Sequence, residues 1–341
     1  MSANRRTVLL SGLATLLVPW SSGCGPGPGP VTPPSPPLPA LHTSPLADLV
    51  AAGGLRWILL AAPRELLSVP WIPPLVDLAV SGARFDRFAK VTGIDLRAIP
   101  EAIVTSTTSK SDDEVLFYLA RHTGDPAFIE RSFRARLTSE EKRSVDRPDL
   151  IRVSGKVGRA PNAAVFIGPD IAGFQEAGSM SRGPARVAAL FAEQKLKSAH
   201  TALAVDPIRS LAAKLGPAPR SAFAPGPFEG DLARGLRGLL GAATGIGGVL
   251  RPSVRQGFFV TLAVSGDFAT SSGPAGSELM AAWNDLAQSR LGHVLGLDAP
   301  LTAPSIALAP DAVGLSVELS GRALADGLAR LTATRVEDIF R

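Results

Sequence analysis

Alternation of apolar and polar residues marks two segments of the chain as half-buried β-strands. Residues 151–157 have the sequence IRVSGKV, and residues 313–319 have the sequence VGLSVEL. Because successive side chains of a strand point to opposite faces of a sheet, this period of two indicates one buried and one exposed face. The apolar stretch 163–167 follows the first segment across a short polar turn, and we expect the two to pair as a hairpin.

A period of about four positions predicts helices between the strands. After Asp125 and Pro126, a pair typical of a helix start, apolar Ile129, Phe133 and Leu137 recur every four positions. The same approach predicts further helices at 75–91, 183–197, 276–295 and 322–331. Further strands are expected at 56–62, 102–107, 114–120, 257–264 and 305–309.

The order of these elements predicts an α+β fold, with antiparallel sheets and helices packed on one face. Segments 46–202 and 256–341 share the order strand, helix, hairpin, helix, which fits two related halves. The Gly/Pro-rich region 203–255 would connect them. Few residues are identical between the halves, so a chance resemblance of element order is an equal alternative.

The N-terminal segment has a different pattern from the body. Residues 1–23 contain a charged head with Arg5 and Arg6, an apolar stretch over residues 7–20, and small residues ending at Gly23, directly before Cys24. This layout is typical of a signal peptide. The apolar stretch is shorter than the roughly 20 residues that a membrane-spanning helix needs.

Small residues before Cys24 resemble the lipobox of bacterial prolipoproteins. The resemblance implies cleavage between Gly23 and Cys24, acylation of the cysteine, and membrane attachment through acyl chains such as palmitate. Arg5 and Arg6 also resemble the twin-arginine export motif, although the head of an ordinary signal peptide carries such a pair as well. By the same resemblance, Gly25 implies the periplasmic face of the outer membrane rather than the inner membrane, with the cell surface as an alternative.

Proline dominates the segment that follows the cysteine. Nine of the residues 25–45 are proline, and such a sequence favours extended polyproline geometry at about 3.1 Å per residue. We interpret residues 24–45, with His42, as a semi-rigid tether between the anchor and the body. A ligand for an SH3-like domain is the alternative.

Charge and cysteine content narrow the possible functions. The net charge of +5 falls to +3 once Arg5 and Arg6 are removed, and no run alternates basic with aromatic residues, so the pattern of a nucleic-acid binder is missing. The chain contains one cysteine, which excludes an intrachain disulfide and a zinc site built on several thiolates. A cysteine that merely packs in the core is the alternative to lipidation.

Motifs for hydrolysis are missing from the sequence. No GxSxG occurs, and the nearest match, 178–183, is interpreted as a loop before a helix that starts at Pro184. Ser139 and Lys142 have the SxxK spacing of penicillin-binding enzymes, where both side chains lie on one helical turn. Because this pair lies in a solvated stretch and no KTG follows, we interpret it as a chance match.

Metal and phosphate sites have no support in the sequence either. The four histidines are isolated, and we expect neither a metal nor a cofactor. Glycines 241, 245, 247 and 248 lack the spacing of a phosphate-binding loop, and close packing or a bulge explains them more simply. Arg322, Asp326 and Arg330 are four residues apart and are expected to form ion pairs on a solvated helix face.

One loop is a candidate binding surface. Segment 223–230 is rich in Pro, Gly and Phe, and we name Phe228 with Arg234 and Arg237 as candidate binding residues.

These observations favour a membrane-anchored lipoprotein of the cell envelope that acts as a non-enzymatic binding or structural module. Its expected partners are the membrane, through the lipid anchor, and an envelope protein or apolar ligand, but no nucleic acid. A carrier or chaperone of a lipid or apolar ligand is the first alternative. An envelope hydrolase whose catalytic groups converge without a linear motif is the second.

Overall fold

The structure is a computed structural model in which the chain divides into two compact units, residues 1–39 and 40–341. The described residues are 38–108, 114–178, 182–196 and 198–333. The predicted signal peptide, with Arg5, Arg6 and Gly23, lies outside them, as does Cys24. The expected tether is shortened at its far end, because residues 40–45 belong to the second unit, where the backbone N–H of His42 donates to Ala192 O at 2.8 Å.

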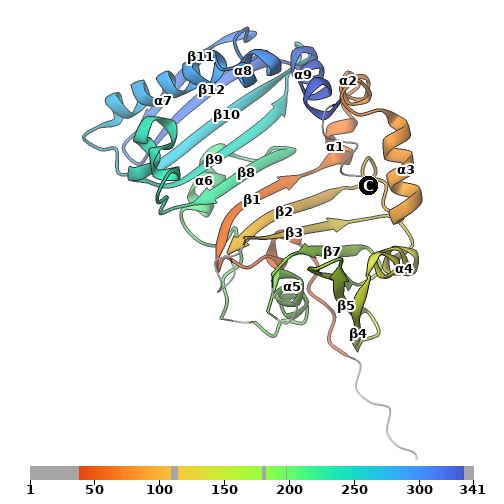
Figure 1. The fold of residues 1–341 in the computed structure, drawn as a ribbon. Helices are drawn as coiled ribbons and strands as arrows, with labels where there is room; N and C mark the ends of the chain where they lie inside the picture. The colour runs from red at the N-terminus through yellow and green to blue at the C-terminus, as the bar shows by residue number, and fades with distance from the viewer. Residues whose placement is uncertain (1–37, 109–113, 179–181, 197, 334–341) are drawn as a thin grey trace, which may run out of the picture. The chain divides into compact units, whose positions relative to one another are not determined.

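Twelve antiparallel strands of the second unit form one sheet, and this confirms the α+β fold class (Figure 1). The strands of the first half are β1 (Leu55–Ala61), β2 (Glu101–Thr108), β3 (Glu114–Arg121), β4 (Ser139–Arg147), β5 (Leu150–Val157), β6 (Ala160–Ile167) and β7 (Ile171–Glu176). Those of the second half are β8 (Arg220–Pro225), β9 (Ala243–Pro252), β10 (Gly257–Gly266), β11 (Thr302–Ala309) and β12 (Ala312–Ser320). Their order across the sheet is β11-β12-β10-β9-β8-β1-β2-β3-β7-β6-β5-β4.

Helices cover parts of both faces of this sheet, which adds a second helical layer to the one we expected. The first half contains η1 (Leu46–Leu49), α1 (Pro63–Leu67), α2 (Ile72–Ala79), α3 (Gly82–Thr92), α4 (Pro126–Arg136) and α5 (Pro184–Ala192). The second half contains α6 (Ile208–Leu215), η2 (Leu232–Ala242), α7 (Ser272–Ala287), α8 (Arg290–Leu295) and α9 (Gly321–Ala333). None of the helices among the described residues is long and apolar enough to cross a membrane.

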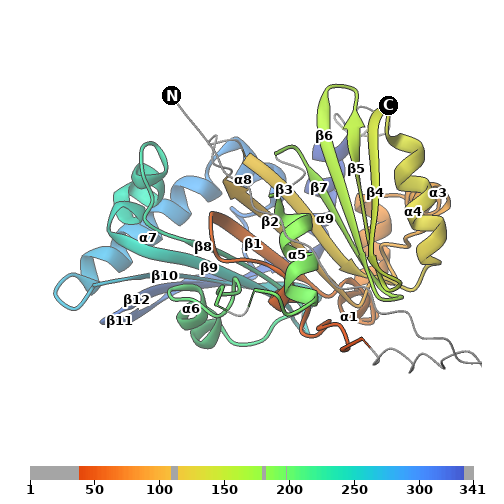
Figure 2. The same ribbon diagram turned by 90° about the horizontal axis from the view of Figure 1, so that it is seen from below.

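Alternate residues of β6 show that the sheet is buried on both sides. Val165 and Ile167 belong to a core that also contains residues of η1, α5 and α6, whereas Ala164 and Phe166 belong to a second core formed with α3 and α4. Figure 2 shows α5 and α6 in front of the sheet, seen from below. A third core packs α7 and η2 against β10 and β12.

The two halves have similar topologies. In each half three strands form a meander, β1-β2-β3 or β8-β9-β10, a helix follows, and the chain returns in a hairpin whose second strand pairs with the third meander strand, β7 with β3 and β12 with β10. The first half carries the additional hairpin β4-β5. Strands β1 and β8 pair antiparallel, from Ile58↔Phe223 to Ala61↔Arg220, and join the halves.

Region 203–255 is corrected from a connection to a part of the sheet, because it contains α6, β8 and β9. Its glycines allow close packing, as expected. A Cβ atom at Gly245 would lie 2.6 Å from Pro207 Cγ, and one at Gly247 would lie 2.7 Å from Phe223 Cδ1. The missing side chains let α6 and its neighbours approach strand β9.

The clearest sequence patterns correspond to observed elements. The hairpin β5-β6 forms, the side chain of Asp125 accepts a hydrogen bond from Ala127 N at 3.0 Å at the start of α4, and Ile129 and Phe133 are buried. Arg322 Nε donates to Asp326 Oδ2 at 3.0 Å on an exposed helix face, which confirms this ion pair.

Two predicted long helices are each divided in two. The segment 75–91 is interrupted at Val80, whose backbone is extended, so that α2 ends and α3 begins. The segment 276–295 is interrupted at Ser289, whose Oγ accepts from Gly292 N at 3.0 Å. Serine stabilises a helix start in this way, and α8 therefore begins as a separate helix.

We predict that Gly245→Ala destabilises the protein, because its methyl group would collide with Pro207 and Leu211, 2.6 and 3.1 Å from the added carbon. Overpacking of this kind costs about 1–3 kcal/mol. Gly248→Ala, in the same strand on the opposite face, is the control, since its added carbon would meet its nearest atom at 3.5 Å. Urea unfolding measures both, and an equal loss of stability would contradict the packing role of Gly245.

Candidate functional site

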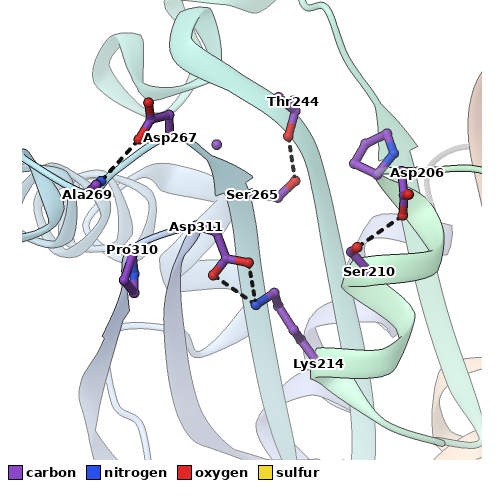
Figure 3. A pocket seen from close by; sticks show the side chains of 11 residues that line it. Asp206, Ser210, Lys214, Thr244, Ser265, Asp267, Ala269, Pro310 and Asp311 are labelled. Atoms are coloured by element: carbon purple, nitrogen blue, oxygen red, sulfur yellow. Dashed lines mark hydrogen bonds and ion pairs between the residues drawn. The ribbon is translucent and has the colours of Figure 1, made fainter.

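A pocket of about 630 Å³ lies where α6 meets the ends of β9 and β10 and the turn between β11 and β12 (Figure 3). Its polar groups are carboxylates, hydroxyl groups and one lysine, and apolar atoms make up most of its exposed surface. The lining residues are Asp206, Pro207, Ser210, Lys214, Thr244, Ser265, Gly266, Asp267, Ala269, Pro310 and Asp311. The volume lies within the range of about 300–1,000 Å³ typical of small-molecule sites.

A bulge in β9 positions the hydroxyl groups. The pairing with β10 passes from Gly245↔Ser265 to Ala243↔Gly266, which leaves Thr244 without a partner in the register. Thr244 Oγ1 lies 3.1 Å from Ser265 Oγ, and Ser265 Oγ also lies 3.2 Å from Gly245 O, to which it can donate. Bulges reorient side chains in this way, and here the bulge turns a hydroxyl towards the pocket.

An ion pair connects α6 to the turn between β11 and β12. Lys214 Nζ lies 2.9 Å from Asp311 Oδ1 and 2.8 Å from Oδ2, although the two residues are 97 positions apart. The hydrogen bond from Lys214 lowers the pKa of Asp311 below its usual value. Asp311 is therefore ionised at neutral pH, and its charge is balanced by the lysine.

The other two carboxylates of the pocket differ in their partners. Asp206 accepts from Ser210 Oγ at 3.0 Å and from Arg209 Nη2 at 2.7 Å, and the Ser210 hydrogen bond is the main cause of its lowered pKa. Asp267 accepts from Ala269 N at 3.3 Å, and no described residue supplies it with a cationic partner. Asp267 is thus the carboxylate of this pocket that is available to a ligand.

The lining offers hydrogen-bonding groups to a ligand. No histidine or cysteine lines the pocket, and its possible general bases are the three aspartates and Lys214. Within the described part of the chain, no group of three His, Cys, Asp or Glu side chains is arranged to hold a metal ion. Carboxylates and hydroxyls instead supply acceptors for a ligand that carries N–H or O–H donors.

The candidate binding residues Phe228, Arg234 and Arg237 do not line this pocket. Phe228 packs against the core beneath α7, and Arg234 is 84% exposed and lies 3.4 Å from Asp231. Arg237 bridges Glu278 and Asp285 of α7, at 3.0 Å from each. This bridge gives Arg237 a structural role, because it fastens η2 to α7.

The other sequence candidates have structural explanations. Ser139 and Lys142 lie in strand β4 rather than on a helical turn, so they do not have the SxxK geometry. In the segment 178–183, residues 179–181 lie outside the described residues, and α5 begins at Pro184 as expected. His293 is held by Asp298, with 2.7 Å between Nδ1 and Oδ2.

His122 is the most buried histidine, with 4% of its surface exposed. Neither ring nitrogen makes a hydrogen bond of good geometry. Burial lowers the pKa of His122. The backbone of Gly124 and the charge on Asp170 raise this pKa, but their effect is smaller than that of burial. The neutral imidazole is therefore the form that suits the folded state.

Comparisons with protein-family models, with curated proteins and with solved structures found no match.

We predict that His122 makes the protein less stable as the pH falls. Its lowered pKa in the folded state means that the unfolded chain binds the proton first, so stability is lost as the pH falls below the unfolded value of about 6.5. The loss levels off below the folded pKa. In His122→Asn, stability between pH 7.5 and 5 should depend less steeply on pH. Urea unfolding at several pH values provides the measurement, and an unchanged slope would rule out this role.

Proposed function

We propose that this protein is a lipid-anchored, non-enzymatic binding module of the bacterial cell envelope, and that the pocket beside α6 receives its ligand. The sequence around Cys24 supports the anchor, and the proline-rich segment after it supports a body held away from the membrane. The observation that carries the binding role is the pocket itself, whose polar groups are held by hydrogen bonds but have no histidine or cysteine among them.

The charge of the pocket favours a small cationic ligand. Three aspartates line it against one lysine, and that lysine is already paired with Asp311. Asp267 has no cationic partner among the described residues, so an ammonium or guanidinium group would complete its charge balance. Ser265 and Thr244 also line the pocket and supply further oxygen acceptors.

The pocket between α3 and α4 does not support the apolar-carrier alternative. The pocket lined by Phe88, Ile129, Phe133 and Phe174, between α3 and α4, has a volume of about 80 Å³. This is well below the roughly 300 Å³ at which small-molecule sites begin.

We expect the diamine and polyamine probes putrescine and spermidine to bind, as measured by isothermal titration calorimetry. Asp267→Asn should weaken binding by about tenfold or more, because a hydrogen bond to a charged group contributes about 1.5–3 kcal/mol. The variant keeps a side-chain oxygen that can accept from Ala269 N. Asp231→Asn is the charge-matched control, since Asp231 is 98% exposed and lies outside the pocket.

Three outcomes would count against the cationic ligand. The probes could fail to bind, or the two variants could weaken binding equally, which would indicate unspecific attraction. Binding of a neutral sugar such as glucose in place of the amines would assign the site to hydroxylated ligands.

The anchor is tested separately by intact mass spectrometry of the membrane-extracted protein. We expect a mature chain that begins at Cys24 and carries added acyl mass, whereas Cys24→Ala should remain unacylated and lose membrane attachment. An unacylated wild-type chain would make this a secreted or periplasmic protein and would reopen the hydrolase alternative.

A further inference from the structure

The two outer strands of the sheet, β4 and β11, differ in how they are protected. Each has a single neighbouring strand, β5 for β4 and β12 for β11. The outer side of such a strand presents backbone N–H and C=O groups that can pair with another strand. Figure 1 shows β11 and β4 at opposite ends of the sheet.

Strand β4 carries the features that prevent further pairing. Six of its nine residues are charged, namely Glu140, Glu141, Lys142, Arg143, Asp146 and Arg147. Its register with β5 is broken twice, between Ser139 and Lys142 and between Val145 and Arg147. Charges and irregular register are the usual means by which proteins protect a sheet edge.

Strand β11 has such protection only at its start, where Pro304 lies in a register shift between Thr302 and Ser305. Its sequence, TAPSIALA, contains no charged residue, and from Ser305 to Ala309 it pairs with β12 in unbroken register. Leu308 is 53% exposed although its neighbour Val313 in β12 is fully buried. Pro304 lies in the irregular part of the strand, so the regular edge covers five residues, a common strand length.

The similar topology of the two halves indicates what is missing beside β11. Strands β6 and β11 occupy the same position, since each begins the hairpin whose second strand joins the meander. In the first half β5 pairs antiparallel with β6. In the second half, no described strand occupies the corresponding place.

We propose that β11 pairs antiparallel with β11 of a second copy of this chain, so that the two sheets become continuous across a twofold axis at Ala307. In this register Ser305 lies opposite Ala309 of the second copy, and Ile306 lies opposite Leu308 of the second copy. Paired residues share a face, so the apolar side chains that α7 covers extend across the junction. Every second residue of β11 directs its backbone N–H and C=O groups away from β12. This register places these residues of one copy opposite the same set of residues in the second copy, so their groups can form hydrogen bonds.

The residues around the junction are compatible with a copy of the same chain. The twofold axis brings Asp311 next to Ala303 of the second copy, and residues 299–304 contain no charge. On α7, Glu278 and Asp285 are paired with Arg237, which reduces repulsion between the two α7 helices. Gly276 holds α7 close to the strand, since a Cβ there would lie 2.7 Å from Leu308 Cδ2.

Disulfide crosslinking of the full-length protein in its membrane tests the proposal. Directly opposite residues in antiparallel strands have Cα atoms about 4.5–5.5 Å apart, a separation that a disulfide can span. Ala307→Cys should therefore form a covalent homodimer under mild oxidation. Val145→Cys, at the other edge with 51% exposure, is the matched control and should remain largely monomeric. Wild type shows any contribution from Cys24.

A second substitution separates specific pairing from chance collision. Adding Leu308→Lys to Ala307→Cys should reduce the crosslinked fraction at least fivefold, because it places an ammonium group in the apolar junction. Leu308 is half exposed, so folding is expected to persist, and circular dichroism verifies it. Crosslinking no greater than that of Val145→Cys, or undiminished by Leu308→Lys, would overturn the proposal. So would a disulfide from Ala307→Cys to a different protein, which would identify another occupant of this edge.

Discussion

Strands β1 and β8 pair antiparallel at the centre of the sheet, and this pairing makes the two halves one structure. Ile58 and Phe223 lie opposite each other and are both buried, in a core that extends from η1 and α5 of the first half to α6 of the second. The remaining strands extend outward from this pair in order. Without it, each half would have a further unpaired edge, and the shared core would lose its central strands.

The pocket depends on the same core. Helix α6 rests on β9 because Gly245 and Gly247 leave room for Pro207, Leu211 and Leu215. That contact brings the start of α6, with Asp206, beside the bulge of β9. The ion pair between Lys214 and Asp311 then connects the helix to the last hairpin. The pocket is thus formed by four separate stretches of chain held together by packing that is largely apolar.

Helices and strands whose pattern depends on residues within the element could be predicted from the sequence. Elements whose residues are explained by contacts with distant parts of the chain could not. The alternation in β5 and β12 and the capped stripe of α4 follow from the side chains within each element, and they were predicted. Strand β4 was missed because its charged residues protect an edge, so neither face shows an apolar pattern. Strand β9 was missed because its glycines, which loosen a strand locally, are explained only by α6 above them.

The candidate site was missed for a related reason. Its residues extend from Asp206 to Asp311, and no short motif links them. Arg237, which follows the loop that did stand out in the sequence, fastens η2 to α7. The available signal was the pair of polar residues at the end of strand β10, Ser265 and Asp267.

The unequal edges of the sheet correspond to the main difference in topology between the two halves. In the first half, the hairpin β4-β5 extends the sheet beyond β6 and ends it in a charged, irregular strand. The second half stops one hairpin earlier, at the strand equivalent to β6. A strand in the position of β6 has a neighbouring strand on each side, so it needs no charged residues to prevent further pairing. At the end of the sheet, the equally uncharged strand β11 leaves unpaired backbone groups beside an exposed leucine. Pairing with β11 of a second copy would form hydrogen bonds to these groups without a further hairpin in the chain. The same pairing therefore accounts both for the absence of a hairpin beside β11 and for the uncharged sequence of this edge strand.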